Sequence, residues 1–316
     1  MTPSAQPLDD SLARLRRVAD RALARLVVPP DTPPVLTDAL RYPVEAGGKR
    51  LRPVLCLAAA EAVAPLSGIA EDRAVKQAVH AACALELVHT YSLVHDDLPA
   101  MDDDTLRRGL PTTHVVYGDG LAVLVGDALL TRAFEVIVSQ PDPDGSLTSR
   151  KLQVVALLAR AAGAEGMVGG QAIDLDAAGK GRPGATPAVA LDANAVRAMH
   201  GRKTGALIRA SATSGAIMAG APPHVVGAVD RYAAELGLAF QIVDDILDVE
   251  GSAAELGKSA GKDAAAGKPT YPALFGLNES RHMAAHCVER ALVALDQARV
   301  AGILPDLARW VLTRRS

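Results

Sequence analysis

The sequence predicts an all-α protein, and three observations support that fold class. Alanine and leucine dominate the composition, whereas the 316 residues hold only three Phe, five Tyr and one Trp. Apolar residues recur at helical spacing along most of the chain, and no alternating strand pattern competes with them. The apolar fraction of 49% is ample for a core. We expect one domain over residues 1–316.

The helices are expected in the following order. Leu8, Leu12, Leu15, Ala19 and Ala22 lie on one face of an opening helix that stops at "PPDTPP". Further helices are expected over residues 53–63, 71–97, 118–138, 148–163, 192–219, 223–249, 279–300 and 303–314. Glycine, proline and polar residues predict loops at 141–146, 177–187 and 251–272. The last loop is long for a compact domain and contains three lysines, which favours a functional role.

Charge and composition exclude several classes of protein. The net charge is −3 and the pI about 6.2, so the chain lacks the basic character of a nucleic-acid-binding domain. Its three cysteines are far apart in apolar surroundings, which is typical of reduced thiols. The start "MTPSAQPLDD" does not resemble a signal peptide. The most apolar later stretches, such as "GALIRASATSGAIMAG", carry an arginine and fall short of a membrane span. We expect a cytoplasmic protein without nucleic-acid partners or stable membrane association.

Two aspartate clusters are embedded in apolar helices. The stretch "HDDLPAMDDDTLRRG", residues 95–109, places five aspartates at the expected end of a helix, where the helix dipole disfavours negative charge. In "FQIVDDILD", Asp244 and Asp248 are four residues apart and share one helix face. One such run alone could be a solvated face paired with lysines. Two runs in apolar surroundings, without histidine or thiolate ligands, favour Mg²⁺.

Basic segments accompany the acidic ones. "GGKRLRP", residues 47–53, crowds three cations at the start of a helix, where the dipole favours an anion such as a diphosphate. Taken alone, this segment could equally be a solvated basic turn. Other cations follow the first aspartate cluster, lie in "HGRKTGALIRA", and fall in the long loop as Lys258, Lys262 and Lys268. Together these segments predict two diphosphate sites, one of them bridged by metal.

At this point the sequence resembles the trans-isoprenyl diphosphate synthases, or polyprenyl synthetases, and most nearly the bacterial farnesyl diphosphate synthases (geranyltranstransferases). "DDLPAMD" followed by "LRRG", and "DDILD" after "FQ", match the two aspartate motifs of that family. "GGKRLRP", "GGQAIDLD" and "KTGALIRA" match as well, in family order between about residues 40 and 275. The resemblance implies an isoprenoid-synthase helical bundle around a central cavity, with the two aspartate motifs facing each other, and a homodimer.

The resemblance also implies roles for individual residues. The Mg²⁺ ligands would be Asp96, Asp102 and Asp244, supported by Asp97 and Asp248, with about three ions per site once substrate is bound. The residues expected to bind isopentenyl diphosphate are Lys49, Arg52, His89 and Arg108. Those expected to bind the allylic diphosphate are Arg107, Lys203, Thr204, Gln241, Lys258 and Lys268. Of these, Lys203, Thr204, Gln241 and Arg107 are implied to act in catalysis. The C-terminal "LTRRS" could fold over the diphosphate site through Arg314 and Arg315, although a frayed basic end is favoured.

The activity that follows from the resemblance is a prenyltransferase of isoprenoid biosynthesis. It would condense isopentenyl diphosphate with dimethylallyl or geranyl diphosphate to farnesyl diphosphate, by Mg²⁺-assisted ionisation of the allylic diphosphate. Tyr91 and Ser92 precede Asp96 by about one turn, and a bulky Tyr91 would limit chain length, although spacing alone allows an ordinary core tyrosine. The alternatives are a geranylgeranyl or geranyl diphosphate synthase, or a noncatalytic partner subunit that binds prenyl diphosphates. A terpene cyclase is disfavoured because both aspartate motifs are present.

Overall fold

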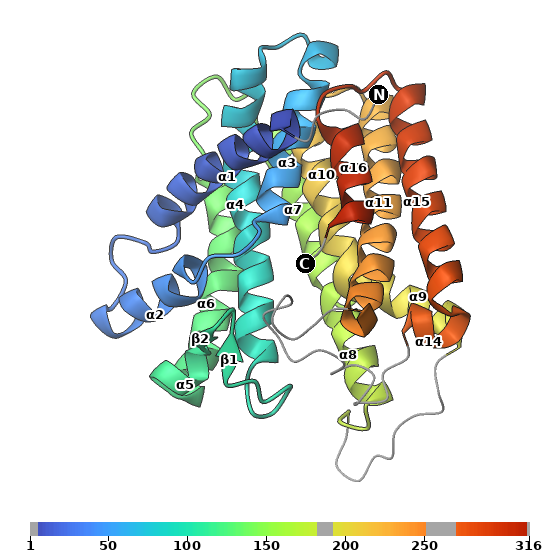
Figure 1. The fold of residues 1–316 in the computed structure, drawn as a ribbon. Helices are drawn as coiled ribbons and strands as arrows, with labels where there is room; N and C mark the ends of the chain where they lie inside the picture. Colours follow the sequence, from blue (N-terminus) through green and yellow to red (C-terminus); the bar gives the residue numbers. More distant parts are fainter. Residues whose placement is uncertain (1–5, 182–191, 251–269, 315–316) are drawn as a thin grey trace. The chain divides into compact units, whose positions relative to one another are not determined.

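The structure, a computed structural model, describes residues 6–181, 192–250 and 270–314 (Figure 1). Its described part is built of α-helices with one two-stranded hairpin, which confirms the predicted all-α class. The chain divides into two compact units: residues 1–157 with 211–222 form unit 1, and residues 158–210 with 223–316 form unit 2. The single domain expected from the sequence stays a prediction.

Unit 1 is organised around the long helix α4, Glu71–Asp96. Helices α3, Leu51–Val63, and α6, Asp119–Val138, pack against α4, and α1, Gln6–Leu26, contacts both α3 and α4. Small buried side chains such as Ala78, Ala81 and Ala82 allow these helices to approach closely. The remaining elements of the unit are α2 (Pro34–Glu45), η1 (Pro65–Ser67), β1 (Leu106–Arg107), β2 (Leu110–Pro111) and α5 (Thr113–Tyr117).

Unit 2 is organised around α11, Pro223–Glu250, which packs against α15, Leu277–Gln297, and α16, Leu304–Thr313. The fully buried Tyr232 of α11 donates a hydrogen bond of 2.8 Å to the carbonyl oxygen of Leu304 and so ties α11 to α16. The other elements of the unit are α8 (Met167–Ala177), α9 (Ala193–His200), the π-helical turn η2 (Gly201–Gly205) and α14 (Tyr271–Phe275). Two boundaries between the units fall within α7, Thr148–Ala162, and α10, Ala206–Met218, and the third lies between residues 222 and 223, where α11 begins.

Every helix expected from periodicity is present, with ends shifted by a few residues. The segment 192–219, expected as one helix, consists of α9, η2 and α10. The sequence did not predict α2 or α8. Pro43 lies inside α2, and α8 contains the pair Gly169–Gly170, so both segments have poor helix propensity. All three cysteines are buried and free, as expected.

One segment differs from the expectation about membrane spans. Thr148–Ala177 contains an 18-residue window that is long and apolar enough to cross a membrane by length and composition alone. A core helix of a soluble protein passes the same test, and 33% of this window is buried. The segment is not one continuous helix, because residues 163–166 separate α7 from α8.

Candidate active site

The first aspartate motif lies where α4 ends, and the chain folds back there onto the helix. The backbone N–H of Asp102 donates to the carbonyl oxygen of Asp96 at 2.9 Å, and that of Asp103 donates to Leu98 at 3.1 Å. Asp103 has a left-handed backbone with φ 56°, which permits this tight return. The fold-back brings the backbone of Asp102, whose side chain is exposed, to that of the partly buried Asp96.

Asp97 lies at the same helix end but is buried, with 4% of its side chain exposed. The Nε of Arg107 donates to both of its oxygens at 2.9 Å, and Nη2 donates to Oδ1 at 2.6 Å. Burial raises the pKa of Asp97, and the Arg107 guanidinium only partly offsets that rise. Both oxygens of Asp97 therefore hold Arg107 in place, and the supporting role at a metal stays a prediction.

The strands β1 and β2 form a hairpin that carries Arg107 and Arg108. Arg107 pairs with Leu110, and the two-residue turn Arg108–Gly109 has positive φ at both positions (55° and 78°), as type I′ hairpin turns require. The Arg108 guanidinium donates to the carbonyl oxygen of Gly47. A Cβ on Gly48 would lie 2.5 Å from Arg108 Nη1. Gly48 of "GGKRLRP" thus admits Arg108 beside the basic loop.

Four arginines of unit 1 lie near His89. The pKa of His89 lies well below its ordinary value of 6.5, first because of burial and then because of the guanidiniums of Arg52, Arg108, Arg107 and Arg50. The side chains of Arg52, His89 and Arg108 are hereafter called the cation cluster. Lys49, which precedes Arg52 by three residues in the sequence, is exposed. Of the residues predicted to bind isopentenyl diphosphate, Arg52, His89 and Arg108 therefore lie close together.

Arg52 is the least compensated member of the cation cluster. Its Nε is buried and has no hydrogen-bond acceptor within the described ranges. Burial lowers the pKa of Arg52 to about 10; the charge of Glu86 opposes this shift, and that of Arg108 adds to it. A partly buried guanidinium whose Nε lacks an acceptor is costly next to a second cation unless an anion joins them.

The second aspartate motif lies on α11. The side chain of Asp244 is 57% exposed, and Asp248, one turn later on the same face, is partly exposed. Asp245 between them is buried, and its Oδ1 accepts a hydrogen bond of 2.9 Å from Gln241 Nε2. Its Oδ2 accepts one of 2.9 Å from the backbone N–H of Tyr271. Asp245 thus orients the predicted substrate residue Gln241, a role that the sequence pattern did not indicate.

Lys203 and Thr204 lie in the π-helical turn η2, and such turns are frequent at functional sites. Helix α8 positions Lys203 in two ways. A Cβ on Gly170 would lie 2.3 Å from the Lys203 backbone nitrogen, so only glycine allows this approach. One turn later, Asp174 Oδ2 accepts a hydrogen bond of 2.5 Å from Lys203 Nζ. The "GGQAIDLD" and "KTGALIRA" segments therefore pack directly against each other.

The C-terminal arginine corrects an expectation. Arg314 is buried, whereas the sequence was interpreted as ending in a frayed basic tail. Its guanidinium lies 4.0 Å from the centroid of the Phe240 ring. Nη2 donates at 3.1 Å to the carbonyl oxygen of Phe240 and at 3.1 Å to Asp244 Oδ1. Seventy residues of sequence separate Arg314 from Asp244, so periodicity could not reveal this contact.

Tyr91, the predicted limit on chain length, is buried with 6% of its surface exposed. Its ring meets that of His95 edge to face, with centroids 5.8 Å apart. The hydroxyl of Ser92 donates to the carbonyl oxygen of His89 at 2.9 Å, so Ser92 is tied to its own helix. Two further predicted site residues, Lys258 and Lys268, lie outside the described residues.

The aspartates offer only carboxylate oxygens, the ligands that Mg²⁺ prefers. Within residues 6–181, 192–250 and 270–314, no three His, Cys, Asp or Glu side chains converge into a ready metal centre. Mg²⁺ does not need such a centre, since it is commonly held by one or two carboxylates together with water and substrate phosphates. Asp96 with Asp102, and Asp244 with Asp248, fit that requirement.

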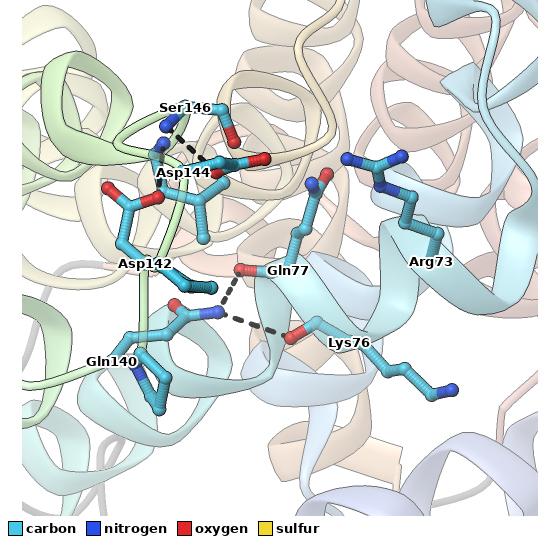
Figure 2. A pocket seen from close by; sticks show the side chains of 10 residues that line it. Arg73, Lys76, Gln77, Gln140, Asp142, Asp144 and Ser146 are labelled. Carbon is cyan, nitrogen blue, oxygen red and sulfur yellow. Dashed lines mark hydrogen bonds between the residues drawn. The ribbon is translucent and has the colours of Figure 1, made fainter.

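A separate pocket of about 260 Å³ lies at the other end of α4 (Figure 2). It is lined by Arg73, Lys76, Gln77 and the segment 140–147. Lys76 and Asp96 are twenty residues apart on α4, so the pocket is roughly 30 Å along the helix from the first aspartate motif. It contains none of the predicted site residues.

Comparisons with known proteins give a consistent result. The family described as "Polyprenyl synthetase" matches residues 33–301. The chain is 41% identical over 295 residues to a farnesyl diphosphate synthase of Geobacillus stearothermophilus, covering 93% of each chain. It is 44% identical over 264 residues to a geranylgeranyl diphosphate synthase of Cyanophora paradoxa, covering 84% of this chain and 82% of the relative. A crystal structure of an FPP/GFPP synthase from Zymomonas mobilis is similar with a TM-score of 0.79 and 35% identity, over 98% of this chain and 99% of that one.

Proposed function

Because the chain belongs to the polyprenyl synthetase family, we propose that it condenses isopentenyl diphosphate with dimethylallyl and geranyl diphosphates to give farnesyl diphosphate. The coarser activity, prenyl transfer that elongates an allylic diphosphate, is that of the family. The finer points are the fifteen-carbon product, Mg²⁺ as the metal and the assignment of each diphosphate to its residues.

The observation that carries the proposal is the buried Nε of Arg52 in the cation cluster, which lacks a hydrogen-bond acceptor in the part of the chain that the structure describes. Burial lowers the pKa of Arg52, and the neighbouring Arg108 lowers it further. A diphosphate supplies several oxygen acceptors and the missing negative charge. We assign the diphosphate of isopentenyl diphosphate to Lys49, Arg52, His89 and Arg108.

The allylic diphosphate is assigned to the aspartate motifs and their neighbours. Asp96, Asp102, Asp244 and Asp248 would hold Mg²⁺, which when bound neutralises the charge of the leaving diphosphate. Arg107, held by Asp97, adds a fixed positive charge. Lys203, held by Asp174, adds another. Gln241 and Thr204 would direct an amide and a hydroxyl dipole toward the developing positive charge of the allylic group. Because these groups are preorganised, they lower the cost of separating that charge from the leaving diphosphate.

The length of the product is assigned from Tyr91. A large, buried side chain on α4, five residues before Asp96, supports an early stop to elongation. A geranylgeranyl product is the second candidate, because relatives of similar identity bear both names. We further propose a homodimer in the cytoplasm, as expected from the sequence.

Product analysis tests the proposal. The purified chain is incubated with Mg²⁺ and labelled isopentenyl diphosphate, together with dimethylallyl or geranyl diphosphate in separate reactions. We expect farnesyl diphosphate from both. A twenty-carbon product would replace the chain-length assignment and keep the chemistry. Absence of any product from the chain alone would favour the noncatalytic partner subunit.

A further inference from the structure

Arg50, the second cation of "GGKRLRP", has no assigned role in the site. It is the N-cap of α3 and is buried, with 6% of its surface exposed. Its backbone is left-handed, with φ 52° and ψ 32°, a conformation that large side chains rarely adopt. Gly47 and Gly48 before it also have positive φ (80° and 139°). The turn that delivers the chain to α3 therefore depends on a bulky residue held in an unfavourable conformation.

Three parts of unit 1 hold the Arg50 guanidinium. Nε donates to Asp20 Oδ1 on α1 at 2.8 Å, and Nη1 donates to Glu86 Oε1 on α4 at 2.9 Å. Nη2 donates to the carbonyl oxygen of Val44 on α2 at 2.6 Å. Burial lowers the pKa of Arg50, but the two carboxylates raise it further, so the side chain stays charged. A planar fork can serve three such acceptors at once, whereas a lysine ammonium cannot reproduce that geometry.

Glu86 connects this arrangement to the cation cluster. It is 2% exposed and lies three residues before His89 on α4, which places both on one side of the helix. Its Oε2 is buried and has no hydrogen-bond partner among the residues described. Its charge also acts on Arg52 and Arg108, raising the pKa of each against the effect of burial. One carboxylate therefore both fixes Arg50 and compensates its cationic neighbours.

We propose that Arg50 is a positioning residue for isopentenyl diphosphate: anchored by Asp20, Glu86 and Val44, it fixes the turn that presents Lys49 and Arg52 to the diphosphate. The proposal rests on the proposed function of the cation cluster and adds to it the residue that orients the basic loop. Arg50 itself is not assigned to the substrate, since it is buried and its Nε, Nη1 and Nη2 each donate to a protein acceptor.

The chain offers a matched control in the pair Arg14–Glu61. Arg14 Nη2 donates to both oxygens of Glu61 at 2.7 and 2.8 Å, and so joins α1 to α3 as Arg50 joins α1 to α4. Glu61 is ten residues from the start of α3, roughly 15 Å along the helix from the basic loop. Arg14→Lys therefore weakens an ion pair between helices without disturbing the turn at Arg50.

The experiment compares Arg50→Lys with Arg14→Lys by steady-state kinetics in both substrates and by thermal unfolding. We expect Arg50→Lys to raise KM for isopentenyl diphosphate about tenfold, with kcat and KM for geranyl diphosphate within about twofold of the unchanged chain. Arg14→Lys should leave all three constants within about twofold. Asp20→Ala, which removes one partly exposed acceptor, should raise the same KM about threefold and covers the case in which Arg50→Lys does not fold.

The outcomes separate positioning from stability alone. A selective rise in KM for isopentenyl diphosphate supports the proposal, and equal changes in every constant, or no difference from Arg14→Lys, overturn it. If the unchanged chain shows no turnover, the proposed function fails. Calorimetric titration with inorganic pyrophosphate then tests whether Arg50 positions the cation cluster. Binding at least about fivefold weaker in Arg50→Lys than in Arg14→Lys supports positioning, and equal binding overturns it.

Discussion

The backbone N–H of Tyr271 donates a hydrogen bond of 2.9 Å to Asp245 Oδ2, so the second aspartate motif also fixes the first residue of α14. The other oxygen of Asp245 accepts from Gln241 Nε2. A single buried carboxylate thus joins a predicted substrate residue to a second helix. On the same helix, Asp244 is exposed and Asp248 is partly exposed.

We predict that Asp245→Asn lowers kcat at least about tenfold and the free energy of unfolding by about 1–3 kcal/mol. Asp245 now accepts from Gln241 Nε2 and from the backbone N–H of Tyr271. The asparagine NH₂ would face one of these two donors, which would be left buried and unpaired. Kinetics and urea unfolding measure both effects. The control is Asp230→Asn: Asp230 lies on α11 like Asp245 and forms an ion pair with Arg209 of α10, and the substitution should change kcat less than about twofold. Equal effects in the two variants would contradict the role of Asp245.

Tyr91→Ala should lengthen the products beyond fifteen carbons. The buried ring of Tyr91 would be replaced by a methyl group, leaving space beside His95 for a longer prenyl chain. Chromatography of the products after removal of the diphosphate measures the change. Tyr117→Ala, which removes an aromatic ring that packs against Tyr42 in the same unit, should leave the products unchanged. Release of only the fifteen-carbon compound by Tyr91→Ala would remove Tyr91 from this role.

The pKa of His89 leads to a prediction about stability and pH. Burial and the surrounding guanidiniums hold this pKa well below 6.5 in the folded chain, so below about pH 6.5 the unfolded chain binds more protons at this position. Stability from this residue is therefore fully present above that pH and is lost as the pH falls, by at most about 1.4 kcal/mol per pH unit.

Urea unfolding between pH 5.5 and 7.5 checks this prediction by comparing the unchanged chain with His89→Gln. Glutamine does not titrate in this range, so the free energy of unfolding should depend less steeply on pH in the variant. The comparison is needed because His80 also has a lowered pKa, caused first by burial, and contributes a slope of the same sign. Parallel slopes in the two proteins would show that His89 is not a strongly perturbed group.

Arg314→Ala should lower the free energy of unfolding by about 1–3 kcal/mol. The substitution removes the contact with the Phe240 ring and the hydrogen bonds to Phe240 and Asp244. Arg309→Ala on the same helix removes an exposed ion pair with Asp306 and should cost less than about 0.5 kcal/mol. Urea unfolding of both variants measures the difference, which would vanish if the C-terminal arginine were frayed in solution.

Local patterns predicted much of the fold and part of the candidate site. Periodicity located α4 and α11, and the four-residue spacing of Asp244 and Asp248 placed them on one face. It could not find partners separated in sequence. The bond from Lys203 to Asp174 spans 29 residues, and that from Arg314 to Asp244 spans 70. Such pairs depend on how helices pack, which a helical period does not specify.

Backbone conformation was equally hidden in the sequence. The left-handed turn at Arg50 and the type I′ turn at Arg108–Gly109 occur at arginines, which have no intrinsic preference for positive φ. Both are held by contacts of the guanidinium: Arg50 with two carboxylates and a carbonyl, and Arg108 with Gly47. The sequence therefore supplied candidate cations for the site, and the tertiary contacts identify Arg50 as one that holds the loop.

The binding of isopentenyl diphosphate to the cation cluster tests the central claim most directly. Calorimetric titration compares the unchanged chain with Arg52→Met. The substitution keeps much of the side-chain volume and removes the guanidinium. We predict saturable binding by the unchanged chain and at least about tenfold weaker binding by Arg52→Met, with no change in fold by circular dichroism. Equal affinity in the two proteins, or no binding to either, would contradict the claim that the Arg52 guanidinium binds a diphosphate.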